Sequence, residues 1–85
     1  MNETRDVRLK RLAMRSMRRG IKEMDLILST YADRHLADMD DATLDVYEAL
    51  LAENDQDLYQ WVTGQSAPPG GYLELILSIS QAFQK

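Results

Sequence analysis

The sequence predicts an all-α protein, a compact bundle of about five short helices. Apolar residues recur at helical spacing along almost the whole chain, and no segment alternates with period two for long enough to suggest a sheet. The breaks between the periodic segments are short, so successive helices should pack against their sequence neighbours. A chain of 85 residues leaves room for one small domain, which we expect to span residues 1–85.

The first predicted helix runs from Thr4, a plausible N-cap, to Arg19. Gly20 is expected to stop it in a left-handed conformation. One apolar stripe of this helix is formed by Val7, Met14 and Met17, with Leu9, Leu12 and Ala13 beside it. The second predicted helix runs from Lys22 to Leu36. Its apolar residues follow the i, i+3, i+4, i+7 rule: Met24, Ile27, Leu28, Tyr31 and His35.

The third predicted helix starts near Asp40, which can cap it, and Met39 and Leu44 stand at the positions of a hydrophobic staple. Its apolar residues, expected to be buried, are Val46, Tyr47, Leu50 and Leu51, and its acids, expected to form a solvated face, are Asp41, Asp45 and Glu48. The fourth runs from Asp55 to Val62, with Asn54 or Asp55 as its cap and Gly64 as its stop.

A loop from Gln65 to Gly71 leads into the fifth predicted helix, from Tyr72 to Gln84. This helix is apolar over much of its circumference, so it is either central or part of an interface. The face expected to be buried comprises Leu73, Ile76, Leu77, Ser80 and Phe83, widened by Leu75 and Ile79.

Charge is distributed unevenly along the chain, whose net charge is −4. Residues 1–22 carry eight basic and two acidic residues, whereas residues 23–85 carry two basic and twelve acidic ones. The basic segment could meet nucleic acid or an acidic partner. Alternatively, it packs beside the acidic remainder and partly neutralises it.

The residues needed for most enzyme chemistry are missing from the sequence. There is no cysteine, and the only histidine, His35, lies on an apolar stripe where a structural role is expected. The carboxylate pairs Asp40–Asp41 and Asp55–Asp57 fall at helix starts, where capping explains them. We therefore expect no enzymatic activity, and no metal or cofactor bound by this chain. No apolar run approaches the ~20 residues that cross a bilayer. A soluble protein of the bacterial cytoplasm is expected if the chain is complete.

Two segments together resemble a known family. In RRGIKEMD the pattern is Arg-Gly-x-x-Glu with an aspartate two residues further on: Arg19, Gly20, Glu23 and Asp25. In LLAENDQDLYQW the matching positions are Leu50, Leu51, Glu53, Asp55, Asp57, Leu58, Tyr59 and Trp61. Many members of the family have proline where this chain has Gln56. Both segments resemble the FAD assembly factors of succinate dehydrogenase, known in bacteria as the SdhE family.

This resemblance implies a small helical protein that binds the flavoprotein subunit of succinate dehydrogenase, and in many members that of fumarate reductase. Such a protein promotes covalent attachment of FAD to a histidine of that subunit, so FAD is the partner's cofactor. Carried onto this chain, the family motif makes Arg19 and Glu23 the expected contacts. Gly20 would permit close approach, and Arg18, Lys22 and Asp25 are secondary candidates. For Asp57 and Trp61 we expect cap and core roles.

Two other functions remain open at this point. A small nucleic-acid-binding or antitoxin-like regulator would use the basic first helix, and its complex would weaken steeply with salt. A structural subunit would use the broad apolar face of the fifth helix. The assembly-factor reading expects a monomer that contacts a protein, without nucleic acid and without insertion into a membrane.

Overall fold

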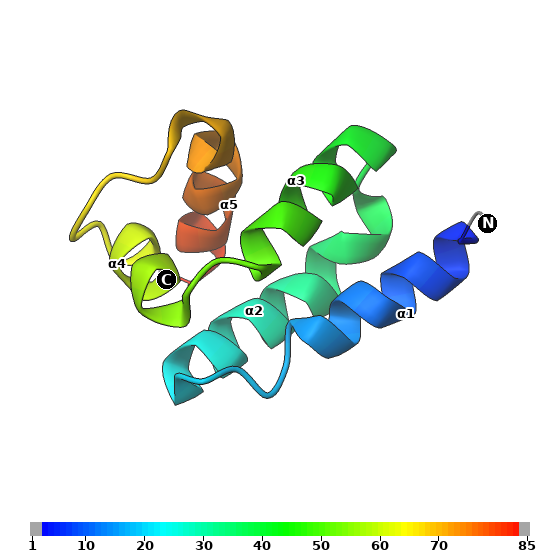
Figure 1. The fold of residues 1–85 in the computed structure, drawn as a ribbon, viewed down its shortest axis with the longest axis horizontal. Helices are drawn as coiled ribbons and strands as arrows, with labels where there is room; N and C mark the ends of the chain where they lie inside the picture. The colour runs from blue at the N-terminus through cyan, green and yellow to red at the C-terminus, as the bar shows by residue number, and fades with distance from the viewer. Residues whose placement is uncertain (1–2, 84–85) are drawn as a thin grey trace.

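The protein is described by a computed structural model over residues 3–83, and this part of the chain is all-α, as predicted. Its five α-helices and two short 3-10 turns follow one another with brief connections (Figure 1). In chain order the elements are α1 (Arg5–Arg15), α2 (Lys22–His35), η1 (Leu36–Asp38), α3 (Asp41–Leu51), α4 (Asp55–Val62), η2 (Gly70–Tyr72) and α5 (Leu73–Phe83).

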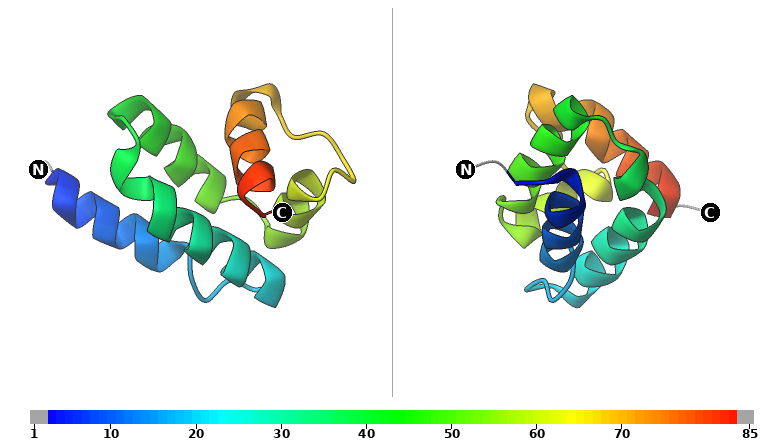
Figure 2. Two further views of the ribbon diagram at one scale, coloured as in Figure 1. Left: turned by 180° about the vertical axis from the view of Figure 1, so that it is seen from behind. Right: turned by 90° about the vertical axis from the view of Figure 1, so that its right-hand side faces the viewer.

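Helix α2 is the centre of the arrangement, because α1, α4 and α5 all pack against it. Helices α1 and α2 run side by side in opposite directions, and α3 lies beside α2 and runs back roughly along it (Figure 1). Helices α4 and α5 gather at the end of the molecule away from the start of α1 (Figure 2). The described part of the protein measures 39 × 25 × 24 Å along its principal axes.

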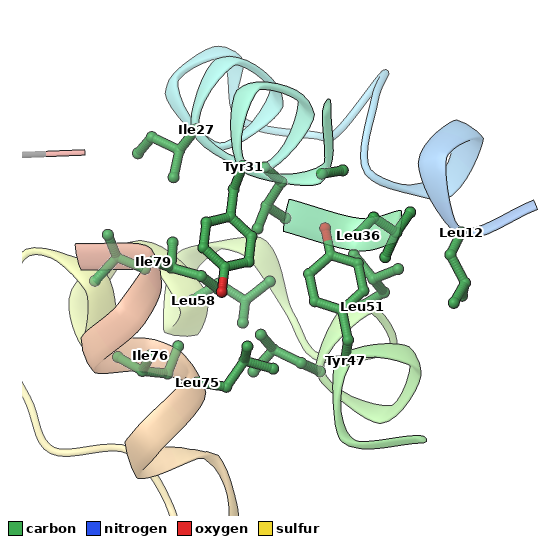
Figure 3. Packing of buried hydrophobic residues seen from close by; sticks show 14 of the residues in the cluster. Leu12, Ile27, Tyr31, Leu36, Tyr47, Leu51, Leu58, Leu75, Ile76 and Ile79 are labelled. Atoms are coloured by element: carbon green, nitrogen blue, oxygen red, sulfur yellow. The ribbon is translucent and has the colours of Figure 1, made fainter. Parts of the chain in front are cut away.

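One hydrophobic core joins all five helices. Figure 3 shows Ile27 and Tyr31 of α2 facing Ile76 and Ile79 of α5, with Tyr47 of α3 beside them. The Tyr31 and Tyr47 rings lie 6.3 Å apart, centroid to centroid, in a tilted arrangement. The other buried core side chains include Leu12, Met24, Leu28, Leu44, Leu50 and Leu58.

Several predicted helix ends are confirmed. Thr4 and Asp40 cap α1 and α3 by accepting from the backbone N–H groups three residues on, and Asn54, the first of the two proposed caps, serves α4. Gly64, beyond the end of α4, has the left-handed φ of +81° that favours glycine. The staple residues before and after the α3 cap, Met39 and Leu44, are both buried.

The predicted apolar stripe of α1 is wrong, because the helix buries its other side. Met14 is 71% exposed and Val7 53%, whereas Leu12 is fully buried. Burial of Leu12 in the core orients the helix, and charged contacts accompany it. Arg8 pairs with Asp45 at 2.7 Å, and both Arg8 and Arg11 pair with Glu48, so the arginine-bearing side of α1 lies against α3.

The acids of α3 are therefore not a purely solvated face. The guanidinium of Arg11, with that of Arg8, holds the pKa of Glu48 below its usual value. The basic segment packs beside the acidic remainder, which is the second of the two interpretations of the charge asymmetry.

The predicted burial of α5 needs a similar correction. The buried residues are Leu75, Ile76 and Ile79, while Leu73, Leu77 and Phe83 are each about half exposed. The residues thought to widen the apolar face are thus its centre, because Ile79 meets Ile27 and Tyr31 of α2 (Figure 3). Gln84, the predicted end of this helix, lies outside the described residues. No helix within residues 3–83 is long and apolar enough to cross a membrane.

Candidate functional site at the joint between α1 and α2

The joint between α1 and α2, which comprises the connecting residues 16–21 and the first turn of α2 (residues 22–25), starts earlier than predicted because α1 ends at Arg15 and not at Arg19. Ser16 is fully buried there. Its Oγ donates to the Leu12 carbonyl at 2.8 Å and lies 2.6 Å from the Tyr47 hydroxyl. Burial among apolar side chains raises the pKa of Tyr47 to about 12. This buried pair ties the end of α1 to α3.

Gly20 does not stop α1, and it does not adopt the left-handed conformation expected of it. The left-handed residue is Arg18, with φ of 55°, and its side chain is exposed. A non-glycine residue there costs roughly 1–2 kcal/mol. The contacts on either side of Arg18 hold it: Ser16 is fixed to Tyr47, and Arg19 is fixed to α4.

Arg19 lies inward against Asp55, the first residue of α4. Its Nε donates to Asp55 Oδ1 at 2.9 Å, and its Nη2 lies 2.8 Å from the same oxygen. The remaining guanidinium contacts are to the backbone carbonyls of Arg15 and Leu51. The two side chains are 11% and 15% exposed, so this is a nearly buried ion pair.

Gly20 approaches the same carboxylate. Its backbone N–H donates to Asp55 Oδ2 at 2.6 Å, and a Cβ at this position would stand 3.3 Å from that oxygen. The close approach that Gly20 permits within the chain is thus to Asp55. Asp55, which capping was thought to explain, instead binds Arg19 and Gly20, which lie 36 and 35 residues earlier in the sequence.

The outward side of the joint carries charges of both signs. Arg18, Lys22 and Glu23 are exposed, and Asp25 is half-buried. None of these four side chains makes a hydrogen bond or ion pair within the part of the chain that the structure describes. We call these four residues the joint surface. Of the six predicted contact residues, the structure places Arg18, Lys22, Glu23 and Asp25 on it and uses Arg19 and Gly20 to hold it.

The second segment of the resemblance packs directly behind the joint. Leu50, Leu51 and Leu58 are buried, and the half-buried Trp61 ring lies 5.9 Å from that of Tyr72. The expectation that Trp61 faces inward is met only in part. Asp57 lies in the first turn of α4, but Asn54 is the cap there.

Two polar residues near the start of α4, Glu53 and Gln56, make hydrogen bonds within the chain. Gln56, which stands where many family members have proline, donates its N–H to Asn54 Oδ1 at 2.8 Å. Glu53 accepts a hydrogen bond from the Tyr72 hydroxyl at 2.8 Å, which raises the pKa of Tyr72. Both residues therefore have structural contacts inside this chain.

The chemistry available at the joint is that of charged contacts. Residues 3–83 hold no group of three or more acids or histidines placed to bind a metal ion. His35 is exposed and lies against Tyr31, with 4.6 Å between the ring centroids. The joint offers cations, carboxylates and a fixed backbone, which suit recognition of another protein's charged groups.

Comparison with known proteins identifies the family. A sequence model of the family described as flavinator of succinate dehydrogenase matches residues 10–83. Curated relatives named mitochondrial succinate dehydrogenase assembly factor 2 include one from Meyerozyma guilliermondii, 48% identical over 61 residues, and one from Candida glabrata, 49% identical over 63 residues. Another, from Drosophila grimshawi, is 40% identical over 73 residues.

The matches cover most of this chain, but only about half of the length of each relative. They cover 72%, 74% and 84% of this chain, and 45%, 41% and 50% of the three relatives, respectively. The names of the relatives place them in mitochondria, so they do not support the expected bacterial cytoplasm, which stays a prediction. With the family model matching most of its length, the chain belongs to the flavinators, or assembly factors, of succinate dehydrogenase.

Proposed function

We propose that this protein binds the flavoprotein subunit of succinate dehydrogenase through the joint surface and promotes covalent attachment of FAD to that subunit. Membership of the flavinator family supports the proposal. The single observation that carries it is that Arg19 and Gly20 both bond Asp55 and so fix the joint. Glu23 and Arg18 meanwhile stay exposed and unpaired within residues 3–83.

Five residues of the joint have a role in this proposal. Glu23 accepts charge-assisted hydrogen bonds from the partner, and Arg18 donates them, with Asp25 contributing at the edge. Arg19 contacts the partner only with what its internal bonds leave free, and its main part is to position the backbone. Gly20 is exposed, so the partner can also approach the backbone there, on the side away from Asp55.

A partner-binding protein can assist flavin attachment without supplying a catalytic group. The bond forms between a histidine of the flavoprotein and its own FAD, and correct positioning of two reacting groups can be worth ~7–11 kcal/mol of barrier. Binding one domain arrangement of the flavoprotein shifts its population toward that arrangement. Accordingly, we propose that this chain is not an enzyme and does not hold FAD itself. Service to fumarate reductase is part of the same proposal.

The nucleic-acid alternative has lost much of its basis. Arg5, Arg8 and Arg11, three of the cations it would use, are paired with acids of this chain. Phosphate contacts need cations that are free to replace counterions. The structural-subunit alternative would use the half-exposed Leu73, Leu77 and Phe83 of α5, and the family match does not favour it.

The proposal is tested by measuring binding of the purified flavoprotein subunit to immobilised protein. Wild type should retain the subunit, and Glu23→Ala should weaken retention about fivefold or more, as expected of an important interface residue. Asp33→Ala is a matched control, since Asp33 is an exposed acid later in the same helix. Equal retention by Glu23→Ala and Asp33→Ala would refute the assigned site, and no retention by wild type would refute the function.

A further inference from the structure

A groove between α2 and α5 begins one helical turn from the joint surface. It encloses about 510 Å³ and is lined mainly by apolar side chains of both helices. Ile27 and Ile79 form its buried floor, and Figure 3 shows them beside Tyr31, whose hydroxyl bonds Ser78 Oγ at 2.8 Å. Leu26, 67% exposed, and Phe83, 45% exposed, form its walls.

Among the residues 3–83 that line the groove, one is a cation and none is an acid. Arg34 is exposed, and it makes no ion pair or hydrogen bond with any other residue between 3 and 83. This sets it apart from Arg5, Arg8, Arg11 and Arg19, which are all paired with acids of this chain. A lone guanidinium beside exposed apolar side chains is suited to a carboxylate that accompanies an apolar group.

The groove and Glu23 share one face of α2. Positions 23, 26, 27, 30 and 34 follow helical spacing, so Glu23, Leu26 and Arg34 lie along the same side of the helix. Glu23 and Arg34 are eleven positions apart, which at 1.5 Å per residue is about 16 Å. An acid therefore stands at one end of this face, a base at the other, and exposed apolar side chains between them.

We propose that the contact with the flavoprotein continues from Glu23 along this groove. The occupant is a segment of the flavoprotein that carries a cation, then a large apolar side chain, then a carboxylate over about 16 Å. Its cation pairs with Glu23, its apolar side chain covers Leu26 and Phe83, and its carboxylate binds Arg34. The inference rests on the proposed function and names the chemistry that the partner surface must present.

The test measures the dissociation constant of the purified flavoprotein subunit with full-length variants. Leu26→Ala and Arg34→Glu change the groove, while Met14→Ala and Lys10→Glu make the same kinds of change on the outer side of α1. Met14 is as exposed as Leu26, and Lys10 is an exposed cation, so circular dichroism should show all four variants folded. Each groove variant should weaken binding about fivefold or more, and each control less than twofold.

Three outcomes would overturn the inference. If the groove variants bind like wild type while Glu23→Ala binds weakly, the proposed function stands and the groove is not part of the interface. If wild type does not bind the flavoprotein, both proposals fall. If sedimentation shows a dimer that Leu26→Ala dissociates, while binding of the flavoprotein is unchanged by that substitution, a second copy of this chain occupies the groove.

Discussion

Removing the carboxylate of Asp55 should destabilise the protein by about 3 kcal/mol, at the lower end of the ~3–5 kcal/mol expected when one partner of a buried ion pair is lost. Asp55→Ala leaves Arg19 charged in a site that is 11% exposed, and it leaves the Gly20 N–H without its acceptor. The value lies at the lower end because Arg19 keeps the carbonyls of Arg15 and Leu51.

The protein should survive this loss, since a chain of 85 residues has a stability of roughly 4–13 kcal/mol. Urea unfolding can be followed by the fluorescence of Trp61, the single tryptophan, and by circular dichroism. Asp57→Ala is the control. Asp57 shares the first turn of α4 and its dipole but is exposed and unpaired among the described residues, so its loss should cost at most ~1 kcal/mol.

A double-mutant cycle isolates the pair itself. Arg19→Ala and Asp55→Ala should show a coupling of about 2 kcal/mol, within the range of ~0.5–3 kcal/mol for residues in direct contact. The reasoning is refuted if Asp55→Ala costs no more than Asp57→Ala, or if the coupling is close to zero.

Three further predictions concern the joint and the α1–α3 contact. Tyr47→Phe removes the hydroxyl that bonds buried Ser16 and should lower the free energy of unfolding by about 1 kcal/mol; an unchanged urea midpoint would contradict this. Gly20→Val should destabilise more than Gly70→Val in thermal melts, because a Cβ at Gly20 stands 3.3 Å from Asp55 Oδ2 while one at Gly70 meets nothing within 4 Å. Arg11 lowers the pKa of Glu48 from its ordinary value of 4.5. The stabilisation that the Arg11–Glu48 ion pair contributes should therefore be present at neutral pH and lost as the pH falls through the lowered pKa of Glu48. In Glu48→Gln the free energy of unfolding should therefore fall less steeply as the pH is lowered below neutral. An unchanged dependence on pH would count against the ion pair.

The all-α fold and the order of the helices could be predicted because periodicity and caps are local signals. Asp40 caps the residues next to it, and Gly64 ends α4 where its neighbours require a left-handed turn. The buried face of α1 could not be chosen in this way. Its two apolar sides are similar, and the choice goes with contacts far along the chain, where Leu12 joins the common core and Arg8 and Arg11 meet Glu48.

The site likewise shows local signals that could be predicted and a long-range contact that could not. The motif located the joint, and helix-end rules explained each of its residues by its neighbours in sequence. They missed Asp55, because the bonds that it accepts from Arg19 and Gly20 span 36 and 35 residues of sequence. One signal was present: both segments of the resemblance contain charged residues, of which Arg19 in one and Asp55 in the other are opposite in sign. Pairing the two segments would have suggested that they meet in space.

The central claim is tested most directly by the covalent flavin carried by the succinate dehydrogenase flavoprotein. The subunit would be produced in a strain lacking its own assembly factor, with wild type, Glu23→Ala, Asp33→Ala or empty vector, and its flavin fluorescence read in a denaturing gel. We predict strong fluorescence with wild type and Asp33→Ala and a marked reduction with Glu23→Ala. Fluorescence with wild type that does not exceed the empty vector would contradict the proposed function.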